Sequence, residues 1–197
     1  MDSWGQKLLD SAFTISEMLT IGLGLSSSTL PEFIRFGTHI LSPSGSDLNI
    51  YGDKAGTVLA GFHSDISFLT IHGRSRFLGL YLFTSEGDRI PCKIPKGYLL
   101  VQAGAQLDYL TGGYTKKGYY EVVVPENTCR VVKVWKEKSD SLWAVHPAMN
   151  VHVEPDRVLQ PVGEFGHGMQ ADWYPPIYAG EQVEEELESI KLTRIAS

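Results

Sequence analysis

The chain has 197 residues, of which 43% are hydrophobic and 20% are charged, and its net charge is −6. This composition is typical of one globular domain; it excludes collagen-like, coiled-coil and disordered chains, and the lack of a basic block argues against a nucleic-acid partner. No apolar run approaches the ~20 residues of a membrane-spanning helix, and the first residues, MDSWGQKLLD, contain no signal-peptide core. The two cysteines, Cys92 and Cys129, fit reduced thiols better than a disulfide framework or a zinc site. We therefore expect an intracellular, cytoplasmic protein.

The first segment predicts helices. Within residues 3–25, apolar side chains recur at three- and four-residue steps and so line one helix face. These side chains are Trp4, Leu8, Ala12, Ile15 and Leu19. Gly22 and Gly24 end the helix, and a second, short helix is expected over Pro31–Phe36. Residues 1–37 should form a helical lead-in packed on the rest of the domain.

From about His39 to Met149, short apolar or alternating runs are separated by turn residues. The expected strands are 57–62, 67–71, 78–83, 89–94, 98–102, 106–110, 118–124, 129–135 and 141–145. Many short strands at this spacing predict a sandwich, jelly roll or barrel. We place the barrel core at residues 38–162 and expect a mainly β fold with flanking helices.

The tail, residues 163–197, should complete the single domain with a loop and a helix. The loop is rich in Gly, Trp, Tyr and Pro, and the helix is expected from about Glu181 to Leu192. Its acidic residues gather toward the N-terminal end, where the helix dipole favours them, as on an ordinary solvated helix face.

His63-Ser64-Asp65 lies at the junction of two expected strands. A His-X-Asp pair places an imidazole and a carboxylate on the same face of an extended chain. These are two of the three donors in the 2-His-1-carboxylate facial triad, which holds Fe(II) and leaves coordination positions open. On its own, such a pair is more often an incidental surface or capping pair.

The surrounding segments are more specific than the pair. They are GFHSDISFLTIHGRSRFLGLYLF, GYLLVQAGAQLDYLTGG, GYYEVVV and SLWAVHPAM. In order, spacing and glycine positions, this stretch resembles the C-terminal half of 2-oxoglutarate/Fe(II)-dependent dioxygenases of the isopenicillin N synthase-like family. The resemblance covers roughly Trp4 to Leu192. It implies a double-stranded β-helix (jelly-roll) barrel, Fe(II) held by His63 and Asp65, and 2-oxoglutarate as cosubstrate.

Two positions depart from the family pattern. Tyr120 stands where the resemblance implies the second histidine ligand, and a phenol must lose a proton, with an ordinary pKa of about 10, before it can bind a metal as phenolate. Ala144 and His146 stand where the family has the Arg-X-Ser that binds the 2-oxoglutarate carboxylate. Alanine cannot replace the bidentate grip of an arginine. For His146 two interpretations stay open: it supplies a nitrogen or a weaker positive charge, or it only packs at the strand end.

Three functional interpretations follow from the resemblance. The favoured one is a degenerate barrel, with His63, Asp65 and Tyr120 as an incomplete triad, that acts as a binding or assembly module. The alternative is an active metal-dependent oxygenase with an unusual third ligand, and a third interpretation is a different metal or substrate chemistry at His63 and Asp65. Fe(II) is then a candidate cofactor, while 2-oxoglutarate is doubtful. The substrate is not predicted.

The sequence assigns no functional role to the other polar residues. His39 and His72 lie beside turns without metal spacing, and Arg74 and Arg76 fit an exposed turn. His152, His167, Arg130 and Lys133 are expected to face solvent. Family members are longer, with a region ahead of the barrel, so a protein partner or self-association is expected to cover one side of it.

Overall fold

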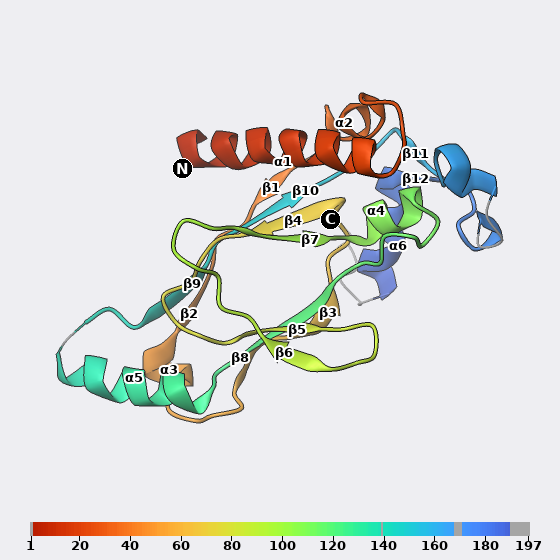
Figure 1. The fold of residues 1–197 in the computed structure, drawn as a ribbon. Coiled ribbons are helices and arrows are strands. Elements are labelled where there is room, and N and C mark those ends of the chain that lie inside the picture. The colour runs from red at the N-terminus through yellow and green to blue at the C-terminus, as the bar shows by residue number, and fades with distance from the viewer. Residues whose placement is uncertain (1, 139, 168–170, 190–197) are drawn as a thin grey trace, which may run out of the picture.

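Two antiparallel four-stranded sheets form the centre of the structure (Figure 1), a computed structural model that describes residues 2–138, 140–167 and 171–189. The first sheet has the order β1–β10–β4–β7, with β1 Ile40–Leu41, β10 Ala148–Val151, β4 Leu69–His72 and β7 Leu100–Ala103. The second has the order β3–β8–β5–β6, with β3 Val58–Ser64, β8 Tyr119–Val123, β5 Leu80–Phe83 and β6 Arg89–Pro91. The expected mainly β, jelly-roll class is confirmed, although the described strands form facing open sheets rather than a closed barrel.

Two short strand pairs form separate two-stranded sheets. They are β2 (Ser44–Asp47) with β9 (Trp143–His146), and β11 (Val158–Leu159) with β12 (Ile177–Tyr178). The pairing of Ser44 with His146 and of Ser46 with Ala144 fixes the alternation along β9. Ala144 and His146 therefore share one side of this strand, as the spacing of two residues predicts.

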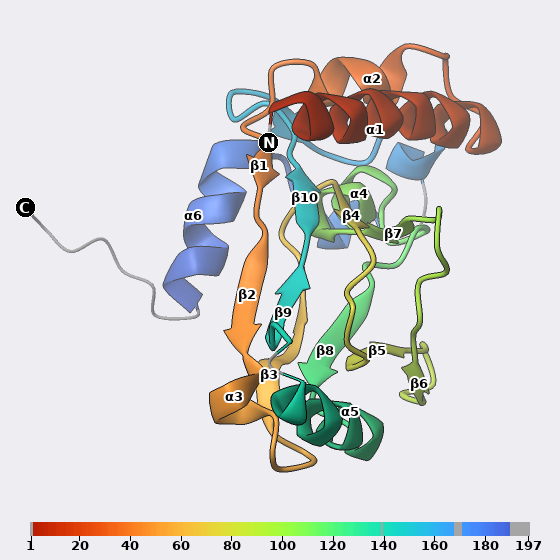
Figure 2. The same ribbon diagram turned by 90° about the vertical axis from the view of Figure 1, so that its left-hand side faces the viewer.

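Helices lie around the sheets (Figure 2). The helices at the first-sheet side are α1 (Asp2–Gly22), α2 (Thr29–Ile34), α4 (Ala105–Leu110) and α6 (Ala179–Ser189). At the opposite end lie α3 (Leu48–Tyr51) and α5 (Glu126–Glu137). Two 3-10 turns cover Gly163–His167 and Ala171–Trp173. None of the described helices is long and apolar enough to cross a membrane.

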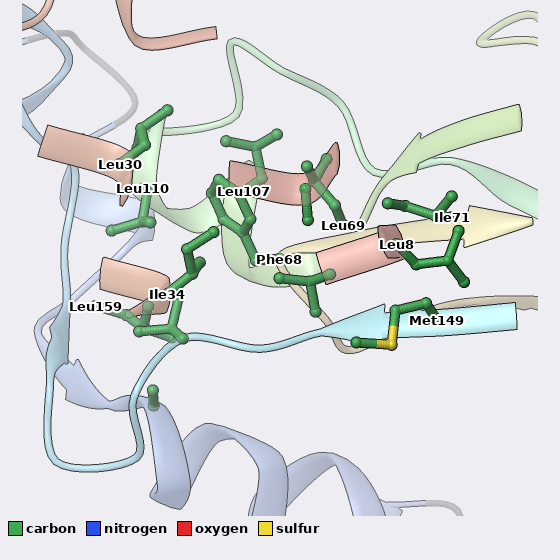
Figure 3. Close-up of a cluster of buried hydrophobic side chains, with 14 residues drawn as sticks. Leu8, Leu30, Ile34, Phe68, Leu69, Ile71, Leu107, Leu110, Met149 and Leu159 are labelled. Carbon is green, nitrogen blue, oxygen red and sulfur yellow. The ribbon is translucent and has the colours of Figure 1, made fainter. Parts of the chain in front are cut away.

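The larger apolar cluster lies between α1 and the first sheet (Figure 3). Helix α1 buries Leu8, Ala12, Ser16 and Thr20 at four-residue steps. Of the predicted apolar face, Leu8 and Ala12 are buried, and the other three members are partly buried against the same cluster. The two buried hydroxyls are satisfied locally, because Ser16 donates to Phe13 O and Thr20 donates to Ser16 O, each at 2.7 Å. This face of α1 can therefore be buried without an unpaired hydroxyl.

A second, smaller apolar cluster lies under α3 and α5. Its buried members are Leu48, Phe77, Val124, Cys129, Val132, Leu142 and Ala144. Between the two clusters the sheets face each other with polar side chains, which include Asp65, Thr70, His72 and Tyr120. This polar layer contains the candidate site.

Two of the expected strands are helices. Residues 106–110 belong to α4 and residues 129–135 belong to α5. The first run is almost entirely buried, and an apolar run of that length does not distinguish a buried strand from a buried helix. In the second, Pro125 and Glu126 are helix-start signals that compete with the valine content. The C-terminal helix is described to Ser189, so Ile190 and Leu192 lie outside the described residues.

Candidate functional site

The sheet register brings the three expected ligand positions together. His63 on β3 pairs directly with Tyr120 on β8, and their ring centroids are 4.3 Å apart. Asp65 follows β3, and its Oδ1 lies 3.8 Å from His63 Nε2. Since Gly61 O accepts the hydrogen bond from His63 Nδ1 (2.6 Å), Nε2 is the nitrogen that stays available.

Asp65 already has a hydroxyl donor on each carboxylate oxygen. The Tyr120 hydroxyl donates to Oδ1 at 3.1 Å, and Thr70 Oγ1 donates to Oδ2 at 2.6 Å. Ser67 Oγ lies 2.9 Å from Thr70 Oγ1 and extends this chain of hydroxyls. The carboxylate is only 12% exposed, so these bonds hold it in place within the polar layer.

Tyr120 is held as a neutral phenol. Burial raises its pKa above the ordinary tyrosine value, and the adjacent Asp65 charge and hydrogen bond raise it further. The hydroxyl therefore acts as a donor to Asp65 and not as a phenolate. The sequence identifies Tyr120 as the residue at the third ligand position, and the structure adds its hydrogen bond to Asp65.

His72 reaches the same site from the opposite sheet. Its ring centroid lies 5.0 Å from that of Tyr120, and its residue is 8% exposed. Within the described residues, His72 Nε2 has no hydrogen-bond partner. Burial lowers the pKa of this imidazole, although Asp65 and Gln102 act in the opposite direction. A bound ligand or water in the cavity can satisfy this nitrogen.

A cavity of about 240 Å³ opens beside these residues. Its inner wall includes His63, His72, Tyr120 and His146. Three cationic side chains, which are Arg74, Arg76 and Lys93, also line it. The geometry thus provides a small polar chamber with imidazole, phenol and cationic groups, which can bind a small molecule by hydrogen bonds and charge.

No known family profile matches the chain. The alpha-ketoglutarate dependent kainoid synthase of Digenea simplex is 35% identical over 81 residues, which are 39% of this chain and 22% of that protein. A full-length protein of Neurospora crassa, solved in complex with alpha-KG, has a TM-score of 0.77 at 16% identity, covering 95% of this chain and 56% of that one. A putative 2OG-Fe(II) oxygenase family protein of Caulobacter crescentus has a TM-score of 0.78 at 21% identity, covering 95% and 58%.

The chain has the 2-oxoglutarate/Fe(II) oxygenase fold. The resemblance found in the sequence is therefore confirmed. The chain spans 22% of the length of the curated relative and 56–58% of these two solved structures.

Within this oxygenase fold, Ala144 does not line the cavity. It is 1% exposed and packs in the second apolar cluster with Phe77 and Leu142. The position that the resemblance matches to the cosubstrate arginine is therefore surrounded by apolar side chains. His146, two residues further along β9, does line the cavity, and burial lowers its pKa.

The donor set does not fit the Fe(II) site of an oxygenase. Among the described residues, no three His, Cys, Asp or Glu side chains are placed to hold one metal ion. His63 and Asp65 are suitable ligands, but the third group is a protonated phenol that already donates to Asp65. A metal would have to displace that hydrogen bond and remove the phenol proton.

Of the residues outside the expected triad, some lie as the sequence predicts and others do not. His152 is buried at 8% exposure, and its backbone N–H donates to His39 Nδ1 at 3.2 Å, so the solvent-facing prediction is wrong. His167 is exposed, as predicted. Arg130 is exposed as predicted but lies on α5, where it pairs with Glu126 at 3.5 Å, rather than on a strand.

His72 and the three cations are site residues that the sequence did not predict. Alternation along β4 carried a signal for His72, because Leu69 and Ile71 enter the larger apolar cluster. Thr70 and His72 must then face the opposite side, toward Asp65. Nothing comparable in the sequence marks Arg74, Arg76 or Lys93, because their approach to the cavity depends on how two separate loops fold.

Proposed function

We propose that this chain is a binding module that keeps the oxygenase fold and its cavity and binds a small molecule there without iron-dependent oxidation. The observation that carries the proposal is the hydrogen bond from the Tyr120 hydroxyl to Asp65 Oδ1 at 3.1 Å. Neutral imidazole is a good Fe(II) ligand near neutral pH, whereas a buried phenol beside a carboxylate holds its proton. Because the Tyr120 hydroxyl and the Asp65 carboxylate are hydrogen-bonded to each other, we expect this pair to have little affinity for a metal.

The surroundings of Ala144 support the same proposal. Strand β9 carries no Lys or Arg, and Ala144 itself is packed among apolar side chains. A 2-oxoglutarate carboxylate at this position would lose its hydration without gaining a charged partner. Charge-assisted hydrogen bonds contribute about 1.5–3 kcal/mol each, so the missing fork weakens binding by on the order of 10²-fold.

A second candidate is an active metal-dependent oxygenase with an unusual third ligand. The observation that favours it is that His63, His72 and His146 line one cavity, so a rearranged side chain has imidazoles to draw on. A different metal chemistry at His63 and Asp65 is a variant of this second candidate, because it also requires a bound metal. An assembly role, in which a protein partner or a second copy covers one side of the sheets, is a further form of the proposal that light scattering tests.

Anaerobic titration with Fe(II), followed by measurement of 2-oxoglutarate conversion to succinate, separates the two candidates. We expect neither tight Fe(II) binding nor turnover by the natural chain. Succinate formation that is abolished by His63→Ala would overturn the proposal and establish the oxygenase.

A matched pair of variants tests the role given to Tyr120. Tyr120→His restores an imidazole beside His63 and Asp65, and we expect it to bind Fe(II) at least about tenfold more tightly than the natural chain. Tyr119→His adds the same group to the neighbouring position, which stacks on Phe62 on the other side of the strand. Equal metal affinity of the two variants would contradict the assignment of Tyr120 to the third ligand position.

A further inference from the structure

The cavity has a positively charged lining in a chain whose net charge is −6. Arg74, Arg76 and Lys93 line it, and of the described residues in its wall none is Asp or Glu. Both oxygens of the nearby Asp65 already accept hydrogen bonds from hydroxyls. Asp65 keeps its negative charge, but it is outnumbered by the three cationic side chains of the lining. The local charge is therefore opposite in sign to that of the whole chain, and it favours an anion.

The cations come from two separate segments of the chain. Arg74 and Arg76 lie in the segment between β4 and β5, which crosses from the first sheet to the second, and Lys93 follows β6 (Figure 1). An anion in the cavity can therefore be contacted from two separate segments. Polar groups from separate segments of one cavity lining are typical of a site that orients one ligand group.

The three cations differ in how firmly they are held. Arg76 donates to Ser141 O at 2.9 Å, and its guanidinium lies 5.3 Å from the Trp135 ring centroid, so its position is fixed. Arg74 and Lys93, by contrast, have no hydrogen bond, ion pair or ring contact within the part of the chain that the structure describes. These two side chains are available to bind a ligand without first breaking an internal contact.

The inner wall supplies a further donor. His72 is 8% exposed, its Nε2 lacks a hydrogen-bond partner among the described residues, and its side chain lines the same cavity. A buried imidazole nitrogen without a partner is costly unless a ligand or water completes it. Its place in the cavity wall allows one ligand to contact both the imidazole and the cations. The cavity volume of about 240 Å³ equals roughly eight waters at ~30 Å³ each, which is room for a small organic acid.

We propose that the cavity binds a small organic acid, whose anionic group is held by Arg74, Arg76 and Lys93 and not by a cation on β9. The proposal rests on the proposed function as a small-molecule binding module and names the chemical class of its ligand. Carboxylates and phosphate monoesters share the required chemistry, since both accept from guanidinium and ammonium groups.

Calorimetric titration of the metal-free full chain, in the presence of EDTA, tests this proposal with benzoate, succinate and phenyl phosphate as acids. Benzamide and succinamide are the neutral counterparts. The test variant is Arg74→Gln with Lys93→Gln, and the control is Lys7→Gln with Lys96→Gln, which removes two exposed charges that do not line the cavity. Both variants change the net charge by the same amount, so long-range electrostatic effects are matched.

We expect at least one acid to bind more tightly than its amide, and the Arg74/Lys93 variant to weaken it about tenfold or more. The control variant should bind the acid with the affinity of the natural chain. Comparison of the affinities for the carboxylates and for phenyl phosphate identifies which anion the site prefers. The histidine ring signals in NMR spectra give a readout independent of the variants. Acid binding should shift the His72 and His146 signals and leave that of the exposed His167 unchanged.

Two results would overturn the proposal, and they bear differently on the proposed function. Equal affinity for acids and amides, unaffected by the Arg74/Lys93 variant, would leave a small-molecule module without anion recognition. No binding of either kind would overturn both the acid site and the small-molecule module. Turnover of 2-oxoglutarate in the separate iron assay would instead remove the proposed function alone.

Discussion

Removal of the Tyr120 hydroxyl tests the hydrogen bond on which the proposed function depends. Tyr120→Phe keeps the ring contacts with His63 and His72 but deletes the donor to Asp65 Oδ1. Hydrogen bonds to charged groups contribute about 1.5–3 kcal/mol. At 3.1 Å, this bond is longer than the usual O–H···O distance, and Tyr120 is only partly buried. We therefore expect a loss of about 1 kcal/mol in the free energy of unfolding.

Guanidinium-induced unfolding, followed by tryptophan fluorescence, measures this loss. Tyr119→Phe is the control, because the Tyr119 hydroxyl makes no hydrogen bond within the described residues and its ring stacks on Phe62. A double-mutant cycle with Asp65→Ala should give a coupling energy of about 1 kcal/mol between the two side chains. A Tyr120→Phe chain as stable as the natural one, with no coupling in the cycle, would refute the reasoning.

Three further predictions concern stability. Lowering the pH from about 7.5 to about 5.5 should reduce the free energy of unfolding. Below the ordinary histidine pKa of about 6.5, histidines of the unfolded chain take up protons that the folded chain excludes. Urea unfolding across this pH range measures the change, and a free energy that does not vary with pH would contradict the prediction. The histidines whose pKa burial lowers are His39, His72, His146 and His152. Gly104→Ala should cost about 1–3 kcal/mol, since its Cβ would lie 1.9 Å from Ser67 O, whereas Gly61→Ala has open space and should cost much less in the same unfolding assay. Ala144→Arg should lower the thermal unfolding temperature strongly, because it forces a charge into the second apolar cluster. Val145→Arg, at an exposed position, should not lower it. Equal unfolding temperatures for the two variants would show that Ala144 is not packed as described.

The sequence allowed the fold class to be predicted because turn residues punctuate it at short intervals. It also placed His63 opposite Tyr120, since the resemblance to the dioxygenases fixes which strands are neighbours. The helix α1 followed from its four-residue apolar steps. These features depend on local pattern or on segment order, both of which a single sequence contains.

Other features depend on contacts between distant segments. Tyr120 meets His72 across the two sheets, and Ala144 packs against residues from α3 and α5. Local alternation places His72 on an inward face but does not say what it faces. The strand expected at 129–135 is a helix for two reasons: Pro125 and Glu126 favour a helix start, and Val132 on α5 packs in the second apolar cluster. Together these outweigh the local β preference of valine.

The polar layer between the two apolar clusters divides the molecule into two packed ends. Regions that open cooperatively in proteins usually coincide with contiguous packed units. The α1 end and the α5 end are therefore expected to fluctuate as separate units, with the cavity at their junction. A ligand that contacts both sheets there would tie the two units together, so occupancy of the cavity would slow amide exchange in both β4 and β8.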